Sequence, residues 1–114
     1  MENVILELFS IRDCVHLSHL AASSYSEHKA LGGLYEGLTD LIDSLVETYQ
    51  GKFGRLKLTG IGKFEVRDSN LLCNEVLAQV EIGYKETKGQ KGIENILADI
   101  ENLANHTKYL LTLK

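Results

Sequence analysis

The stretch from Leu31 to Leu45, LGGLYEGLTDLIDSL, carries the strongest helical pattern in the chain. Its leucines recur at intervals of three, four, three and four residues, at Leu31, Leu34, Leu38, Leu41 and Leu45. Because an α-helix turns once in about 3.6 residues, this spacing puts all of them on one face. Four residues seven apart line the flanking face: His28, Tyr35, Ile42 and Tyr49. The stretch therefore predicts an amphipathic helix that packs within a helical bundle.

Both ends of this helix carry recognisable signals. The string Ser24-Tyr25-Ser26-Glu27 fits a capping box, in which the serine hydroxyl and the glutamate satisfy two backbone donors. We therefore expect the helix to begin near Tyr25. Gly51 and Gly54 end it, and Gly51 is the expected C-cap.

Three further helices are predicted around it. Helical spacing upstream predicts a helix over residues 2–21, with an apolar face formed by Val4, Leu8, Ile11 and Val15. Downstream, Ser69 or Asn70 caps a helix over about 70–87, whose inward face is Leu72, Val76, Val80 and Tyr84. A last helix covers about 92–113, with an apolar face formed by Ile93, Ile96, Leu97, Ile100, Leu103, Ala104 and Leu111.

Residues 52–68 connect the second and third helices and predict the topology. They alternate around Gly60 and Gly62, which indicates either a small hairpin or an extended connection. Seventeen extended residues reach at most about 55–60 Å, whereas a 26-residue helix is about 39 Å long. The third helix can therefore start beside the start of the second and run parallel to it. The prediction is an all-α four-helix bundle with one long crossover, the connection of ferritin-like bundles.

Composition sets the limits of the molecule. The chain has 114 residues, no proline, 44% hydrophobic and 25% charged residues, and a net charge of −4. These values predict one globular domain over residues 1–114, with uninterrupted helices and no bilayer-spanning segment. The first 50 residues hold two basic and eight acidic residues, a net charge of −6, which argues against an N-terminal tail that binds nucleic acid. Cys14 and Cys73 suggest two buried thiols in a reducing cytoplasm.

Histidines gather near the end of the first predicted helix. Asp13, His16 and His19 are three residues apart, so they share a helix face. The usual role of a histidine near a helix C-terminus is to favour the helix dipole and cap carbonyl groups. Beside carboxylates, however, imidazoles suit iron, manganese or zinc.

Carboxylates follow on the second predicted helix. His28 lies near its start, and Asp43 and Glu47 are four residues apart, with Glu36 and Asp40 extending the same acidic side. Such a pair is usually a solvated helix face. Together with the histidines, at these spacings, the set indicates a metal site.

The stretch from His16 to Glu47 resembles the first two helices of Dps-type miniferritins, within the ferritin-like superfamily. In that pattern a histidine late in the first helix is followed twelve residues later by a second, and then by an aspartate and a glutamate four residues apart. The match is closer to small phage-encoded ferritin-like proteins of unsettled function. They carry similar S-Y-x-x-H-K-A-L-G and E-x-Y-Q-G-K-F-G strings, which here read SYSEHKALG at 24–32 and ETYQGKFG at 47–54.

This resemblance implies a ferroxidase centre for iron, shared between two subunits. His16 and His28 of one copy would face Asp43 and Glu47 of its two-fold mate, giving two equivalent sites per dimer. The family has an aspartate four residues after the second histidine, and Gly32 stands at that position. The loss of this carboxylate weighs against iron oxidation. Candidate auxiliary ligands are Asp13, His19 and Asp40.

The sequence therefore leaves two alternative hypotheses for the function. The first is a Dps-like iron-binding protein, with ferroxidase activity if the site is intact, acting as a homodimer or larger homo-oligomer. The second is a degenerate ferritin-like oligomer that binds a host factor or a small anionic ligand during phage infection without catalysis. The basic segment 52–67 offers a weak anion contact, with Lys52, Arg55, Lys57, Lys63 and Arg67.

Overall fold

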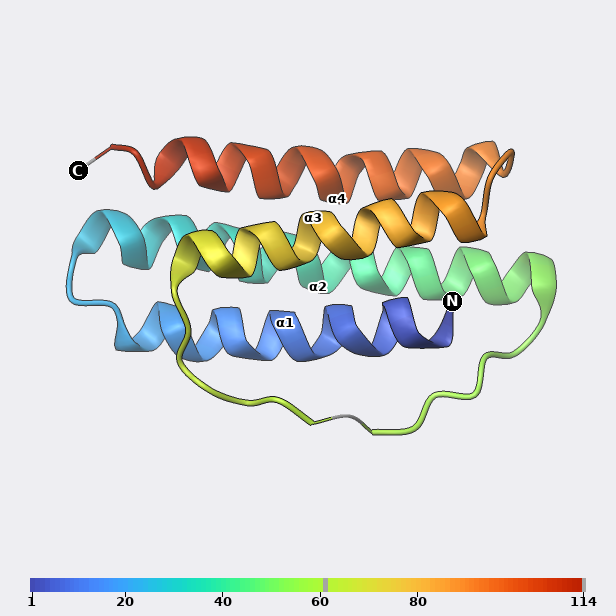
Figure 1. Ribbon diagram of the computed structural model, residues 1–114, viewed down its shortest axis with the longest axis horizontal. Coiled ribbons are helices and arrows are strands. Elements are labelled where there is room, and N and C mark those ends of the chain that lie inside the picture. Colours follow the sequence, from blue (N-terminus) through green and yellow to red (C-terminus); the bar gives the residue numbers. More distant parts are fainter. Residues whose placement is uncertain (61, 114) are drawn as a thin grey trace.

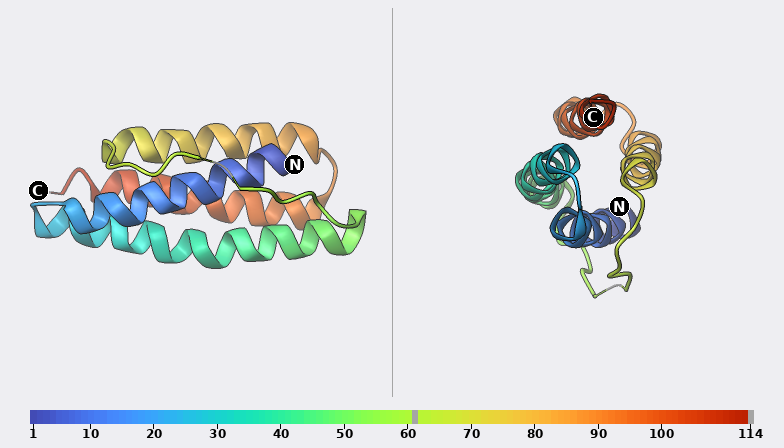
Figure 2. Two further views of the ribbon diagram at one scale, coloured as in Figure 1. Left: turned by 90° about the horizontal axis from the view of Figure 1, so that it is seen from below. Right: turned by 90° about the vertical axis from the view of Figure 1, so that its left-hand side faces the viewer.

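The computed structural model describes residues 1–60 and 62–113, which form four α-helices. They are α1 (Glu2–Ala21), α2 (Tyr25–Phe53), α3 (Ser69–Glu86) and α4 (Lys91–Leu110). Helix α1 packs against α2 and α3, and α4 packs against the same two helices. The helices thus stand at the corners of a square, as the end-on view in Figure 2 shows. This confirms the predicted all-α four-helix bundle.

The crossover between α2 and α3 runs back along the outside of the bundle, past α1 (Figure 1). As a result α2 and α3 point in the same direction from opposite corners of the square, as predicted. Neither 54–60 nor 62–68 contains a strand, so the crossover is an extended connection and not a hairpin. One long crossover in a four-helix bundle is the connectivity of ferritin-like folds.

The core is formed by the apolar faces of all four helices. On α2, the predicted stripe is fully buried at Leu31, Leu34, Leu38 and Leu45, but only partly buried at Leu41. Ile42, predicted on the flanking face, is fully buried instead. An α-helix drifts by about 20° per heptad from an ideal seven-residue repeat, and over a helix of 29 residues this drift turns position 42 inward.

Helix α4 ends at Leu110, three residues before the predicted end, and two helix caps differ from prediction. Helix α2 continues to Phe53, and its C-cap is Gly54, with φ +92°, not Gly51. A residue with side chain is strained at that angle, so the glycine nearer the crossover ends the helix. Helix α3 is capped by Asp68, whose carboxylate accepts the N–H of Leu71 at 3.0 Å, one residue before the predicted cap. At the start of α2, the Ser24 hydroxyl accepts the N–H of Glu27 at 3.2 Å, which is the serine half of the predicted capping box. The hydrogen bonds of the described residues do not include the reciprocal bond to the Glu27 carboxylate.

Small side chains one turn apart on α1 hold the crossover. The Ser10 hydroxyl donates to the carbonyl O of Lys63 at 2.9 Å, and the Cys14 thiol lies 3.5 Å from the same oxygen. One turn further on, the Ser18 hydroxyl accepts the backbone N–H of Arg67 at 3.0 Å. This stripe of serine and cysteine, which the sequence prediction missed, fixes the path of the crossover along α1.

The dimensions of the molecule, the character of its helices and the state of its cysteines complete the description of the fold. The molecule measures 42 × 26 × 19 Å. In the part of the chain that the structure describes, no helix combines the length and apolar character needed to cross a membrane. Cys14 and Cys73 are free and buried, as predicted.

Candidate metal centre

His19 and His28 interlock where α1 ends and α2 begins. Nδ1 of His19 lies 2.5 Å from the carbonyl O of His28, and Nδ1 of His28 lies 2.9 Å from the carbonyl O of His19. The two rings stack with their centroids 3.9 Å apart and their planes 18° apart. Because a carbonyl oxygen only accepts, each Nδ1 must carry the hydrogen. In the neutral rings, Nε2 therefore keeps the lone pair that binds metals.

Gly32 makes room for this interlock. A Cβ atom at this position would lie 2.9 Å from Cε1 of His19, closer than such atoms pack, and 3.2 Å from its Nδ1, which is a tight contact. The ring of His19 thus occupies the space into which a side chain at position 32 would project. The next glycine, Gly33, has no atom within 4 Å of its Cβ position, so of these two adjacent glycines only Gly32 is restricted by the His19 ring.

His16 continues the row of rings along the α1–α2 face. Its ring stacks on that of Tyr35 from α2, with centroids 3.9 Å apart and planes 12° apart. The His16 and His19 centroids are 6.4 Å apart. The structure therefore brings together the three predicted histidines His16, His19 and His28. All of them are partly buried.

A hollow of about 520 Å³ opens beside the interlocked rings. Its lining residues are His19, His28, Lys29, Gly32, Gly33 and Glu36. A second hollow follows along the helix, lined by Tyr35, Glu36, Thr39 and Asp40. Lys29 and Tyr35 were not predicted as site residues. The helical spacing could have placed these two residues at the site. Positions 28, 32 and 36 share one face of a helix, and positions 29 and 35 flank that face.

The predicted carboxylates lie elsewhere on α2. Asp43 and Glu47 are exposed, as is Asp40. Asp43 is fifteen residues beyond His28, which corresponds to about 22 Å along the helix axis. Within one copy, the described residues include no group of three or more His, Cys, Asp or Glu that could hold a metal ion. One chain thus supplies the histidines and the carboxylates of the predicted site at separate places.

The auxiliary residue Asp13 has a partner of its own. Its carboxylate lies 2.9 Å from the guanidinium of Arg12, which also lies over the ring of Phe9 at 5.3 Å. The side chain of Asp13 remains nearly half exposed, so this is a surface ion pair of small energy. To serve as a ligand, Asp13 must first break its ion pair with Arg12. The ion pairs of the described residues do not include Asp40, Asp43 or Glu47.

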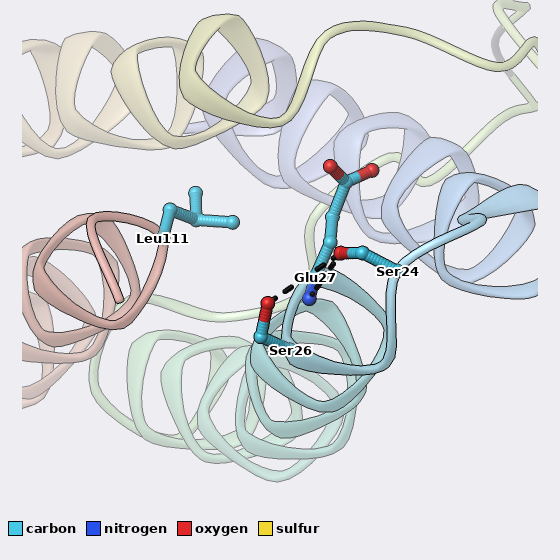
Figure 3. Close-up of a pocket in the computed structure, with 4 residues that line it drawn as sticks. All are labelled: Ser24, Ser26, Glu27 and Leu111. Atoms are coloured by element: carbon cyan, nitrogen blue, oxygen red, sulfur yellow. Dashed lines mark hydrogen bonds between the residues drawn. The ribbon is translucent and has the colours of Figure 1, made fainter. Parts of the chain in front are cut away.

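A separate pocket lies at the end of the bundle, where α2 begins and α4 ends (Figure 3). Ser24, Ser26 and Glu27 line it from α2, and Leu111 stands across from them. The Ser24 hydroxyl already accepts a backbone N–H, and the pocket offers a single carboxylate. Its chemistry is that of a helix cap, not of a metal site.

Comparisons with known proteins bear on the origin of the chain. The model of a family described only as a family of unknown function (DUF5856) matches residues 19–111. The chain is also 32% identical over 101 residues to an uncharacterised 14.6 kDa protein of the mobD–ri intergenic region of Enterobacteria phage T4. That match covers 87% of this chain and 77% of the phage protein. No solved structure matches the chain. Neither description mentions a ferritin or a metal.

Proposed function

The chain belongs to the family of unknown function DUF5856, and we propose that it binds a divalent transition metal, iron first of all, at a site completed by two copies. One copy supplies His16 and His28, and the second supplies Asp43 and Glu47. His19, Asp13 and Asp40 serve as auxiliary donors. Imidazole together with carboxylate is a donor set that suits iron, manganese and zinc.

The observation that carries the proposal is the hydrogen bond from Nδ1 of His28 to the carbonyl O of His19. Histidines that bind metals almost always donate their other ring N–H to a carbonyl or a carboxylate, which fixes the tautomer and the ring orientation. His19 makes the reciprocal hydrogen bond. Two rings that line the same hollow therefore have a fixed tautomer and a fixed orientation.

A two-fold axis would unite the two halves of the site. The midpoint between His28 and Asp43 on α2 falls between Tyr35 and Glu36. If two α2 helices pack antiparallel around an axis at this point, His28 of each copy lies opposite Asp43 of the other. An isologous interface produces this pairing twice, so each dimer holds two equivalent sites.

The proposal is tested by metal binding to mixed variants. His28→Ala and Glu47→Ala should each lose most of the iron(II) or zinc(II) bound per chain in equilibrium dialysis. When both variants are refolded together, a mixed dimer combines the intact carboxylates of one chain with the intact histidines of the other. It should regain one of its two sites. Asp99→Ala, an exposed carboxylate on α4, is the matched control.

The outcomes separate sharing from binding within one chain. Recovery of binding in the mixture requires a shared site, and no recovery contradicts it. Unchanged metal content in both single variants contradicts the ligand set itself. Iron(II) oxidation followed in the same samples tests whether the protein is a ferroxidase in addition to a binder.

A second candidate is a non-enzymatic oligomer that binds a host factor or a small anionic ligand during phage infection. The position of the His19 ring against Gly32 favours it, because that ring stands where a miniferritin-like carboxylate would project. The exposed cations Lys52, Arg55, Lys57 and Lys63 would provide the weak anion contact. This candidate is supported if the protein forms a dimer that does not bind metal and does not oxidise iron(II).

For either function we place the protein in the cytoplasm of the host. The relative from phage T4 supports an origin in a phage genome. The free buried thiols of Cys14 and Cys73 suit a reducing compartment.

A further inference from the structure

The crossover segment 63–67 has one edge that is hydrogen-bonded to α1 and an opposite edge that is open. The carbonyl O of Lys63 and the N–H of Arg67 bind the serine hydroxyls of α1. Those serines are eight residues apart, about 12 Å along α1, and four extended residues span about 13 Å, so the segment between the anchors is extended. Along such a chain, successive residues direct their N–H and C=O to opposite edges. Lys63 and Arg67 therefore face α1, and Phe64 and Val66 present their backbone groups to the opposite edge.

This open edge is accessible and apolar. Phe64 is 68% exposed and Val66 is 58% exposed. Between residues 62 and 67, the hydrogen bonds of the described chain use the backbone only at Lys63 and Arg67. The segment lies outside α1, away from α4 (Figure 2). Unpaired backbone groups on an extended segment form a template for pairing with a further strand.

We propose that this edge pairs antiparallel with the same segment of a second copy, in a two-stranded ribbon centred on Phe64. In this register, Phe64 lies opposite Phe64 of the second copy, and Val66 lies opposite Gly62. Lys63 lies opposite Glu65 of the second copy, and the two-fold axis repeats that contact. The sequence KFEVR is thus complementary to itself in charge and in apolar side chains.

Charge selects this register over its neighbour. Pairing centred on Glu65 would place two Glu65 side chains opposite each other and Lys63 opposite Arg67, both like-charge contacts that destabilise a strand pair. Arg67 is in any case engaged, because its guanidinium donates to the carboxylate of Glu75 on α3. An isolated two-stranded ribbon is marginally stable, so the association is weak and depends on concentration.

The ribbon is independent of the proposed metal site, which lies on the face formed by α1 and α2. The decisive test is a charge swap in the full chain, followed by sedimentation equilibrium at low salt. Lys63→Glu places two carboxylates opposite each other, and Glu65→Lys places two ammonium groups opposite each other. Each should weaken the association at least tenfold. An equal mixture of the two variants restores both opposite-charge contacts and should associate like the wild type, as should the double swap K63E/E65K.

Amide exchange measured by NMR identifies the edge. With rising protein concentration, exchange of the Phe64 and Val66 amides should slow, whereas that of the Glu65 amide should not follow. Both charged side chains are exposed, and Glu65 also lies 3.7 Å from the guanidinium of Arg67 in its own chain. Unchanged helical circular dichroism controls for folding. The proposal is overturned if those two amides exchange at one rate at all concentrations. It is equally overturned if the mixture associates no better than each single variant, or if an extended peptide of another sequence protects the amides where the second copy does not.

Discussion

At the scale of single residues, the absence of a side chain at one position shapes the candidate site. His19 and His28 exchange two ring-to-carbonyl hydrogen bonds, and their rings stack against each other. They fit only because Gly32 leaves its side-chain space to the ring of His19. The absence of a side chain at position 32 thus leaves room for an imidazole from α1.

Substitution of the two adjacent glycines should have effects of opposite sign. Gly32→Ala pushes a methyl group into the His19 ring, and we expect a loss of about 1–2 kcal/mol in the free energy of unfolding, since overpacking outweighs the gain in helix propensity. Gly33→Ala meets no neighbour and should gain about 0.5–1 kcal/mol. Urea unfolding of both variants measures the difference. A stabilised Gly32→Ala variant would contradict the role assigned to the interlock.

The faces of the site residues were predictable, but their contacts were not. Helical spacing alone indicates that Asp13, His16 and His19 share a face, and that Asp43 and Glu47 share another. Spacing carries no information about contacts between helices. The stack of His16 on a tyrosine and the interlock of His19 depend on how closely α1 and α2 approach, which the whole bundle determines.

At the scale of elements, a partly buried polar contact joins α3 to α4. The Tyr84 hydroxyl donates to the Glu101 carboxylate at 3.0 Å. Burial, and then this hydrogen bond, raise the pKa of Tyr84 to about 12 from its usual value of 10. The neutral phenol is therefore the form that the folded bundle prefers.

This shift predicts a loss of stability in alkali. Because the folded pKa lies above the unfolded one, the contribution of Tyr84 is complete below pH 10 and is lost as the pH rises towards 12. In Tyr84→Phe, this part of the decline in unfolding free energy should be absent. Urea unfolding between pH 8 and pH 11.5 measures it, and the tyrosinate absorbance that appears near pH 12 should disappear. An equal decline in both proteins would contradict the assignment.

Helix number and type were predictable at this scale, whereas helix ends were not. All four helices agree with the predicted segments to within three residues. The errors lie at the caps, because more than one residue at each end had suitable chemistry. Gly51 and Gly54 can both end a helix, and Asp68, Ser69 and Asn70 can all begin one. In the folded chain Gly54 ends α2 and Asp68 begins α3.

At the scale of the whole molecule, the crossover sets the direction of α3. It contacts α1 near both ends, since the N–H of Lys57 approaches the Glu2 carboxylate at 3.5 Å and that of Arg67 binds Ser18. Glu2 and Ser18 are about 24 Å apart along α1. The ten residue steps from Lys57 to Arg67 reach at most about 33–36 Å, so the chain has a slack of only two or three residues.

Shortening and lengthening the crossover should therefore differ in effect. Deletion of four residues between Lys57 and Lys63 leaves a reach of about 20–22 Å, too short for both anchors. We expect a loss of about 1–3 kcal/mol in the free energy of unfolding, as the partly buried hydrogen bonds to Ser10 and Ser18 break. Insertion of four Gly/Ser residues at the same place should cost less than about 0.5 kcal/mol. Denaturant titration distinguishes these outcomes, and equal effects would contradict the anchoring.

The class of fold, the four helices, the apolar faces and the parallel order of α2 and α3 all follow from the sequence. Apolar spacing and chain reach are local properties, and both can be read along one chain. Three features became visible only in the folded chain: Ile42 enters the core, the His19 ring fills the space beside Gly32, and serines of α1 hold the crossover. These outcomes depend on helix drift and on contacts between distant segments, which appear only when all four helices pack together.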